Sequence, residues 1–240
     1  KSLEVFLGTL AQYEKGLLEE KYKNISQFID DPLLKKYFEG NKFDFEGYKK
    51  EFYNTKVGVI SEEEKREVCT NYIQGLDWVI NYYKIGMPSW NWYYQRFYAP
   101  FLSDMTDCVK NYKYDWSKNI GQPLTPIEQL MCVLPKCSHY LLPKPYNTNM
   151  VKQFPYYYPD EIKVDCTGKR REWEGIVIVK MVDTNKIKEY NEENKTDEIK
   201  RLERVGKDFV YNYIEKKEGR TFSSYYGNLI DNKVVRRVLE

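Results

Sequence analysis

The chain lacks the features that mark membrane proteins, secreted proteins and zinc-binding proteins. In its 240 residues no apolar run approaches the roughly 20 residues of a membrane-spanning helix, and no signal-peptide pattern opens the chain. Its five cysteines are scattered without a C-x-x-C pair, and His139 is the only histidine. These absences argue against a Cys/His zinc site and a membrane partner. They predict an intracellular protein with reduced thiols, in the nucleus or the cytoplasm.

An excess of charge of one sign is also missing. The formal net charge is +2, so a nucleic-acid partner would depend on local basic patches. The densest basic run, Lys169-Arg170-Arg171, could follow a phosphate backbone, but exposed charges are equally normal at a turn between two strands. The acidic runs 62–64 and 192–193 are typical of solvated helix starts and loops.

Aromatic residues, in contrast, are abundant. They make up 16% of the chain, which contains 23 tyrosines. Four aromatic residues, two of them tryptophans, fall within the five residues 90–94, inside an unusual segment from Gly86 to Pro100. Such a cluster serves either as a packing nucleus or as a platform on which flat ligands stack, nucleic-acid bases first among them.

Apolar periodicity predicts a largely helical first half. A first helix is expected over 2–23, with one buried stripe formed by Leu3, Phe6, Leu7, Leu10, Tyr13, Leu17 and Leu18. A second is expected over 45–53, with Lys49-Lys50 on its outer face.

The best-defined helix follows. Ser61 and Glu64 form a capping box, and the helix should run from there to Gly86, with Trp78 and Tyr83 deeply buried. A rigid helix of this kind would hold the aromatic segment 86–100 in place. Lys1 already lies inside an amphipathic pattern, which predicts that the natural start lies upstream.

The remaining residues change in character. A helix is expected after Pro100, with Asp104 and Asp107 at its start or on its outer face, and a second capping box opens a helix at Thr125. Seven of the ten prolines lie in 123–159, which predicts extended structure there. Strands are expected at 162–164, 175–182 and 209–214, a helix at 183–190, and a solvated charged run at 191–204.

The predicted fold is therefore mainly α, with a small β portion after residue 160. The interpretation divides the chain into a helical region, 1–160, and a smaller mixed α/β portion, 161–240.

The order of several motifs resembles one family. Gly86-x-Pro88-Ser89-Trp90-x-Trp92-Tyr93-Tyr94, then Tyr98-Ala99-Pro100 and Ser103-Asp104, is similar to the second conserved region of the XRN family of 5′→3′ exoribonucleases. Further matching segments span roughly residues 1–215: Leu3-Glu4-x-Phe6-Leu7 with Tyr13-Glu14, Tyr72 to Tyr83, Gln129 to Pro135, Asp165-x-x-Gly168-Lys169, and Trp173-x-Gly175. The chain departs from the family at Gln95-Arg96-Phe97, where relatives usually carry Pro-Tyr-His.

The resemblance implies part of an enzyme. Family members hydrolyse RNA from a 5′-monophosphate with two Mg²⁺ ions held by a carboxylate cluster in the amino-terminal nuclease region, and this chain has no substitute for that cluster. It is then expected to need no cofactor, to be inactive alone, to buttress the nuclease region and to shape a single-stranded RNA entrance. Two alternatives remain: a non-enzymatic module that binds single-stranded RNA, and an interaction scaffold whose aromatics are all core.

The candidate substrate-binding residues are Trp90, Trp92, Tyr93 and Arg96; catalytic and metal-binding residues are not expected in this chain. In an extended segment Trp90 and Trp92 would point the same way, and one of them could stack on a base. At least one ring of the loop 89–94 is expected on a concave surface. Arg96 could meet a phosphate or simply lie on the surface.

Overall fold

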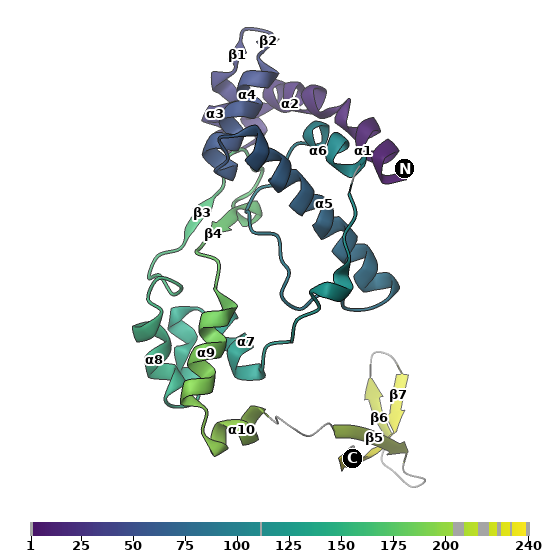
Figure 1. Ribbon diagram of the computed structural model, residues 1–240, viewed down its shortest axis with the longest axis vertical. Helices are drawn as coiled ribbons and strands as arrows, with labels where there is room; N and C mark the ends of the chain where they lie inside the picture. The colour runs from purple at the N-terminus through teal and green to yellow at the C-terminus, as the bar shows by residue number, and fades with distance from the viewer. Residues whose placement is uncertain are drawn as a thin grey trace. The chain divides into compact units, whose positions relative to one another are not determined.

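The computed structural model describes residues 2–110, 112–203, 209–215, 221–224, 227–230 and 232–238 (Figure 1). It is mainly helical with small two-stranded antiparallel sheets, which confirms the predicted fold class. The α-helices are α1 (Ser2–Ala11), α2 (Glu14–Lys23), α3 (Pro32–Lys36), α4 (Phe45–Phe52), α5 (Glu62–Lys84), α6 (Leu102–Lys110), α7 (Pro126–Val133), α8 (Tyr146–Gln153), α9 (Thr184–Asn194) and α10 (Asp197–Glu203). None of the described helices is long and apolar enough to cross a membrane.

Each sheet is a pair of antiparallel strands. The pairs are β1 (Phe38–Glu39) with β2 (Lys42–Phe43), β3 (Lys163–Asp165) with β4 (Ile176–Ile178), β5 (Phe209–Glu215) with β8 (Asn232–Val238), and β6 (Thr221–Ser224) with β7 (Gly227–Ile230). The strands predicted at 162–164 and 209–214 are present, and the one predicted at 175–182 is shorter. The small β1–β2 pair was not predicted, because a two-residue strand is too short to show alternation.

The described residues form two compact units. Unit 1 combines 1–123 with 151–182, and unit 2 combines 124–150 with 183–240. Within 123–159 the structure contains α7, α8 and the 3₁₀ helix η4 (Lys136–Leu141). That stretch is therefore less extended than its prolines predicted, because proline is well accepted in the first turn of a helix. The division of the chain at residue 160 stays a prediction.

Helix α6 is the centre of one core of unit 1. Helices α1 and α5 both pack against it, and the buried side chains of this core are Leu7, Cys69, Ile73 and Met105. The Glu14 carboxylate accepts hydrogen bonds from the backbone N–H groups of Leu102 and Ser103, the latter at 3.0 Å. The first turn of α6 is thus capped by a residue far away in sequence, which satisfies two backbone N–H groups that have no partner within the helix.

The first predicted helix is in fact two helices, and most of its apolar stripe is exposed. The chain bends at Tyr13, between α1 and α2, and of the stripe only Leu7 is buried. The exposed members are Phe6, Leu10, Tyr13 and Leu17, joined by Val5. The prediction of one continuous buried stripe was wrong, because only a single face of α1 is covered by α6.

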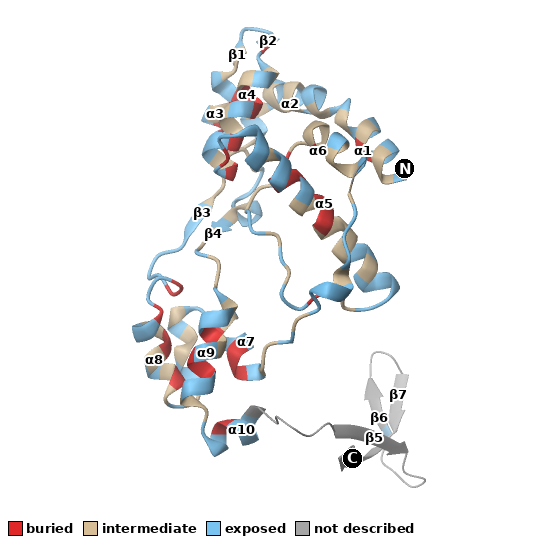
Figure 2. Ribbon diagram, viewed as in Figure 1, coloured by how far each residue is buried: buried red, intermediate tan, exposed pale blue. Residues whose placement is uncertain are grey.

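Helix α5 begins as predicted but ends differently. The Ser61 hydroxyl and the Glu64 side chain form the reciprocal capping box. Its buried residues are Val68, Cys69, Ile73 and Gln74, and Figure 2 shows no red in the later turns of the helix. Trp78 is half-buried and Tyr83 is 82% exposed, so the prediction that both are deeply buried was wrong. Near the end of this helix Val79, Ile80 and Tyr83 are exposed, so none of the described elements covers them.

Unit 2 has its own core between α7 and α9. The predicted capping box of Thr125 and Glu128 is present, and Asp183 caps α9 as expected. Glu128 is buried, and its carboxylate accepts a hydrogen bond of 2.8 Å from the Asn191 amide, itself fully buried. Asn191 also accepts 2.6 Å from the Tyr146 hydroxyl. The run 191–204, predicted as solvated, therefore starts with a core residue.

Candidate functional site

The aromatic segment follows α5 as an irregular loop that is anchored at Ser89. Ser89 is 1% exposed, and its carbonyl accepts the indole N–H of Trp78 at 3.0 Å. Its hydroxyl oxygen accepts the backbone N–H groups of Asn91 and Trp92 at 3.3 and 3.2 Å. A serine side chain that bonds to the backbone two and three residues ahead produces a turn rather than a strand.

This turn separates the two tryptophans that an extended segment would have aligned. The Trp92 ring lies so close to α5 that a Cβ placed on Gly75 would sit 2.9 Å from it. The other side of Trp92 meets Trp116 edge to face, with 5.7 Å between ring centroids. Trp116 is itself held by an indole hydrogen bond of 2.8 Å to the Asp77 carboxylate. Trp92 is therefore a packing residue, and its predicted substrate role is not favoured by its position.

Trp90 has the opposite environment. Its backbone N–H donates to the Ile120 carbonyl at 2.7 Å, which fixes the backbone, while its side chain is 50% exposed. Tyr93 is 42% exposed on the same loop. The prediction that one ring of 89–94 reaches the surface is met; the concavity of that surface stays a prediction.

Arg96 lies on the surface near the end of this loop. Its guanidinium donates to the neighbouring Gln95 carbonyl at 3.2 Å and is otherwise exposed. Trp90, Tyr93 and Arg96 are thus the predicted substrate-binding residues that the structure leaves accessible to a ligand.

The Tyr98-Ala99 and Asp165 motifs, far apart in sequence, meet at one carboxylate. Asp165 accepts hydrogen bonds from Lys56 at 2.5 Å, from the Tyr98 hydroxyl, and from the Thr167 backbone N–H at 3.0 Å. Burial by itself would raise the pKa of Asp165, but the hydrogen bonds from Lys56, Thr167 and Tyr98 outweigh it and hold the pKa well below its usual range. This junction lines a cavity of about 350 Å³.

Lowering the pH should reduce the stability of unit 1, because protonation of Asp165 weakens its hydrogen bonds. Because its folded-state pKa is depressed, its stabilising effect is complete above the unfolded-state pKa of about 3.9 and is lost as the pH falls from there toward the folded-state pKa. We expect Asp165→Asn to be less stable than wild type at neutral pH and to lose less stability below about pH 4. Urea unfolding at a series of pH values measures the free energy of unfolding of each protein. An equal dependence of this free energy on pH in the two proteins below pH 4 would contradict the prediction.

The basic run 169–171 is held against residues 28–29 by a backbone hydrogen bond and a ring contact. The Lys169 carbonyl accepts the Ile29 N–H at 2.7 Å, and Arg170 lies over the Phe28 ring at 5.2 Å. Arg171 lies over Trp173, whose ring is 81% exposed. Trp173 is an accessible aromatic residue that was not among the predicted site residues. Its position next to the densest basic run is the sequence feature that could have marked it as a candidate.

Ser103 and Asp104 are structural. Lys49, predicted on the outer face of its helix, is buried and donates to the Ser103 hydroxyl at 3.0 Å and to the Asp104 carboxylate at 2.9 Å. The Tyr53 hydroxyl donates to the other Asp104 oxygen at 2.9 Å. The prediction that Lys49 lies on the outer face of its helix was wrong, because α4 packs its Lys49 side against the start of α6. Asp104 lies at the start of α6, one of the two places predicted for it, and is paired there with the buried lysine.

The carboxylates of the described residues do not fit a metal site. Among those residues no group of three or more His, Cys, Asp or Glu side chains could hold a metal ion. Asp31, Asp104 and Asp165 each face a lysine, at 2.7, 2.9 and 2.5 Å, so their oxygens are already neutralised. No step of metal chemistry is therefore assigned to these residues, and Mg²⁺ belongs to the prediction for a complete enzyme.

Residues 11–238 match the model of a family described as the Xrn1 helical domain. The chain belongs to this family.

The curated relatives of the chain are 5′-3′ exoribonucleases. It is 36% identical over 177 residues to 5′-3′ exoribonuclease 1 of Saccharomyces cerevisiae, covering 70% of this chain and 11% of that protein. It is 32% identical over 201 residues to 5′-3′ exoribonuclease 2 of Debaryomyces hansenii, covering 78% and 20%. With human 5′-3′ exoribonuclease 1 it is 38% identical over 151 residues, covering 61% and 9%. The chain thus spans between 9% and 20% of the length of these relatives, and the resemblance noted from the motifs is confirmed.

Proposed function

We propose that this XRN helical domain acts within a 5′→3′ exoribonuclease, where it supports the amino-terminal nuclease region and shapes an entrance for single-stranded RNA that begins with a 5′-monophosphate. The observation that carries the proposal is the contrast between Trp90 and Trp92. One ring is exposed on a loop whose backbone is hydrogen-bonded in place, and the other is used to hold that loop. A fixed, exposed ring is what base stacking requires.

The exposed apolar residues of unit 1 support the proposed contact with the nuclease region. Val5, Phe6 and Leu17 on α1 and α2, and Tyr13 between these helices, are each about 60% exposed. Several large apolar side chains exposed in one part of a domain are typical of an interaction site. The relatives are several times longer than this chain, so they contain other regions that could cover it.

Catalysis in the complete enzyme is assigned to the nuclease region with its Mg²⁺ ions. The residues of this chain would contribute by holding the RNA: Trp90 and Tyr93 present rings to bases, and Arg96 presents a guanidinium to phosphate. A nuclear or cytoplasmic location is part of the same proposal.

Alanine variants of Trp90 and Trp92 should differ in their effects on RNA binding and on the stability of unit 1. We expect Trp90→Ala to leave the stability of unit 1 nearly unchanged and to weaken single-stranded RNA binding by the chain, since base–aromatic stacking contributes about 1–3 kcal/mol per base. Trp92→Ala should cost about 2 kcal/mol or more, because the ring fills the space between Gly75 and Trp116. Urea unfolding and fluorescence anisotropy with a labelled oligonucleotide measure the two effects. Parallel losses in both variants would favour the alternative that the aromatics form only a scaffold.

The chain alone should not degrade RNA. Its described residues contain no set of metal ligands, and its family match is to a helical domain. Incubation of pure protein with 5′-monophosphorylated RNA and Mg²⁺ is expected to leave the RNA intact. Processive shortening from the 5′ end would overturn the proposed division of labour. RNA binding without activity in any longer natural form would favour the alternative of a non-enzymatic RNA-binding module.

A further inference from the structure

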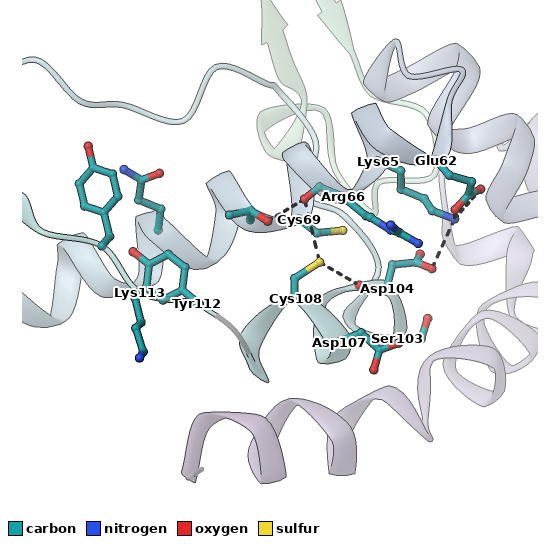
Figure 3. A pocket seen from close by; sticks show the side chains of 13 residues that line it. Glu62, Lys65, Arg66, Cys69, Ser103, Asp104, Asp107, Cys108, Tyr112 and Lys113 are labelled. Atoms are coloured by element: carbon teal, nitrogen blue, oxygen red, sulfur yellow. Dashed lines mark hydrogen bonds and ion pairs between the residues drawn. The ribbon is translucent and has the colours of Figure 1, made fainter.

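A second possible binding site lies away from the aromatic loop. A cavity of about 600 Å³ is lined by α5, by α6 and by residues 112–114 that follow α6 (Figure 3). This volume is within the range of small-molecule sites. None of Trp90, Tyr93 and Arg96 lines it.

Gln74 is the first feature that points to a ligand. Its side chain is 7% exposed and lines the cavity, yet its amide has no hydrogen-bond partner among the residues that the structure describes. The amide nitrogen and oxygen are not themselves fully buried, so they face the space of the cavity and can pair with a ligand there. A carboxamide offers a donor and an acceptor side by side, which is the pattern that pairs with the edge of a nucleobase such as adenine.

Arg66 is the second feature. Three carboxylates at this end of the cavity already have a lysine partner: Glu62 with Lys65 at 2.7 Å, Asp104 with Lys49 at 2.9 Å, and Asp107 with Lys110 at 2.8 Å. The Arg66 guanidinium interacts through space with Glu62 and Asp107, but it forms no hydrogen bond or close ion pair with another described residue, so its donors are available to a ligand. Guanidinium groups bind phosphate oxygens in pairs, with matched geometry.

The two features stand on one face of α5. Arg66 and Gln74 are eight residues apart, or about 12 Å along the helix. Beside the Gln74 end lie the rings of Tyr112, whose hydroxyl is held by Asp77 at 3.2 Å, and Tyr114. Aromatic rings next to a carboxamide can stack on a base while the amide reads its edge.

We propose that this cavity binds one nucleoside phosphate, with the phosphate at Arg66, the edge of the base at Gln74, and the base beside Tyr112 and Tyr114. A free mononucleotide and a nucleotide of a strand carry the same groups. The site is separate from the aromatic loop and goes beyond the function proposed above, so each can fail without the other.

Cys108 provides a reporter inside the cavity. It is half-buried and lines the space between the two ends, whereas burial raises the pKa of its neighbour Cys69 to about 12, which keeps that thiol unreactive. Adenosine 5′-monophosphate should slow the alkylation of Cys108 by iodoacetamide. Peptide mass spectrometry measures the rate of this reaction. It should leave the rate at the exposed Cys137 unchanged.

Two variants test the assigned contacts. Gln74→Leu keeps the shape of a buried side chain that has no partner, so the fold should tolerate it, while adenosine 5′-monophosphate binding measured by calorimetry should weaken about tenfold. Arg66→Ala should weaken it about tenfold as well. Gln153→Leu, on α8, is the matched control and should bind as wild type does. Adenosine without phosphate should bind Arg66→Ala and wild type equally.

The outcomes decide the proposal. It is overturned if neither adenosine 5′-monophosphate nor an oligonucleotide protects Cys108, or if both variants bind the protecting ligand as tightly as wild type. Protection by an oligonucleotide but not by the free nucleotide would assign the site to a strand, and the reverse would assign it to a mononucleotide. Trp90→Ala should leave the protection of Cys108 intact, which keeps this result independent of the aromatic loop.

Discussion

Replacing Gly168 with alanine is expected to destabilise unit 1 by about 3 kcal/mol, through backbone strain and overlap together. Gly168 has a φ of +66°, which an alanine adopts only at a cost. A Cβ added there would lie 2.3 Å from the Asp31 carboxylate and 2.4 Å from the Lys21 ammonium, which are paired with each other at 2.7 Å. The backbone also has little room to shift, because the Gly168 N–H donates to the Ile29 carbonyl at 3.1 Å.

Gly40→Ala is the matched control for this experiment. Gly40 has a similar φ of +57°, but a Cβ there would meet nothing within 4 Å. It should therefore show only the backbone strain, about 1 kcal/mol. All five tryptophans lie in unit 1, at 78, 90, 92, 116 and 173, so tryptophan fluorescence during urea unfolding reports on that unit alone. Equal losses in the two variants would show that the contact with Asp31 is unimportant.

Removing the carboxylate of Asp104 should have the other large effect. In Asp104→Ala the buried Lys49 ammonium loses its counter-charge and Tyr53 loses its acceptor, at an expected cost of about 3–5 kcal/mol. The side chains of Lys49 and Asp104 are only 10% and 15% exposed, so water would compensate for the lost partner only in part. Urea unfolding followed by tryptophan fluorescence measures the loss.

The same helix supplies the control. Asp107 pairs with Lys110 at 2.8 Å, but these side chains are 86% and 53% exposed, and Asp107→Ala should leave the stability of unit 1 nearly unchanged. The double variant Asp104→Ala/Lys49→Met should recover much of the stability, since it removes both charges together. If Asp104→Ala behaves like Asp107→Ala, the Lys49–Asp104 pair is not an important buried contact.

The matched motifs turn out to be largely structural. Glu14 caps α6, Ser89 shapes the aromatic loop, and Asp104 and Asp165 each join segments that are far apart in sequence. Within the aromatic segment, Trp90, Tyr93 and Arg96 remain accessible after these roles are assigned. This is why the RNA contact is proposed for a few side chains and not for the motif as a whole.

Local signals were sufficient for the elements whose stability is local. Both capping boxes, at Ser61 and Thr125, appear as predicted, because their hydrogen bonds join residues three apart. The mainly helical class and the family were also readable, the first from apolar periodicity and the second from the order of motifs.

Burial and pairing were decided only by the tertiary structure. Periodicity shows that a helix has an apolar face, but not whether this chain covers that face; Phe6 and Tyr83 are exposed for this reason. Lys49 is buried because its partner, 55 residues away, lies on α6. Trp90 and Trp92, two residues apart, differ because the Ser89 hydroxyl turns the backbone between them and Gly75 leaves room for only one ring. Sequence spacing carries no record of contacts made by distant segments.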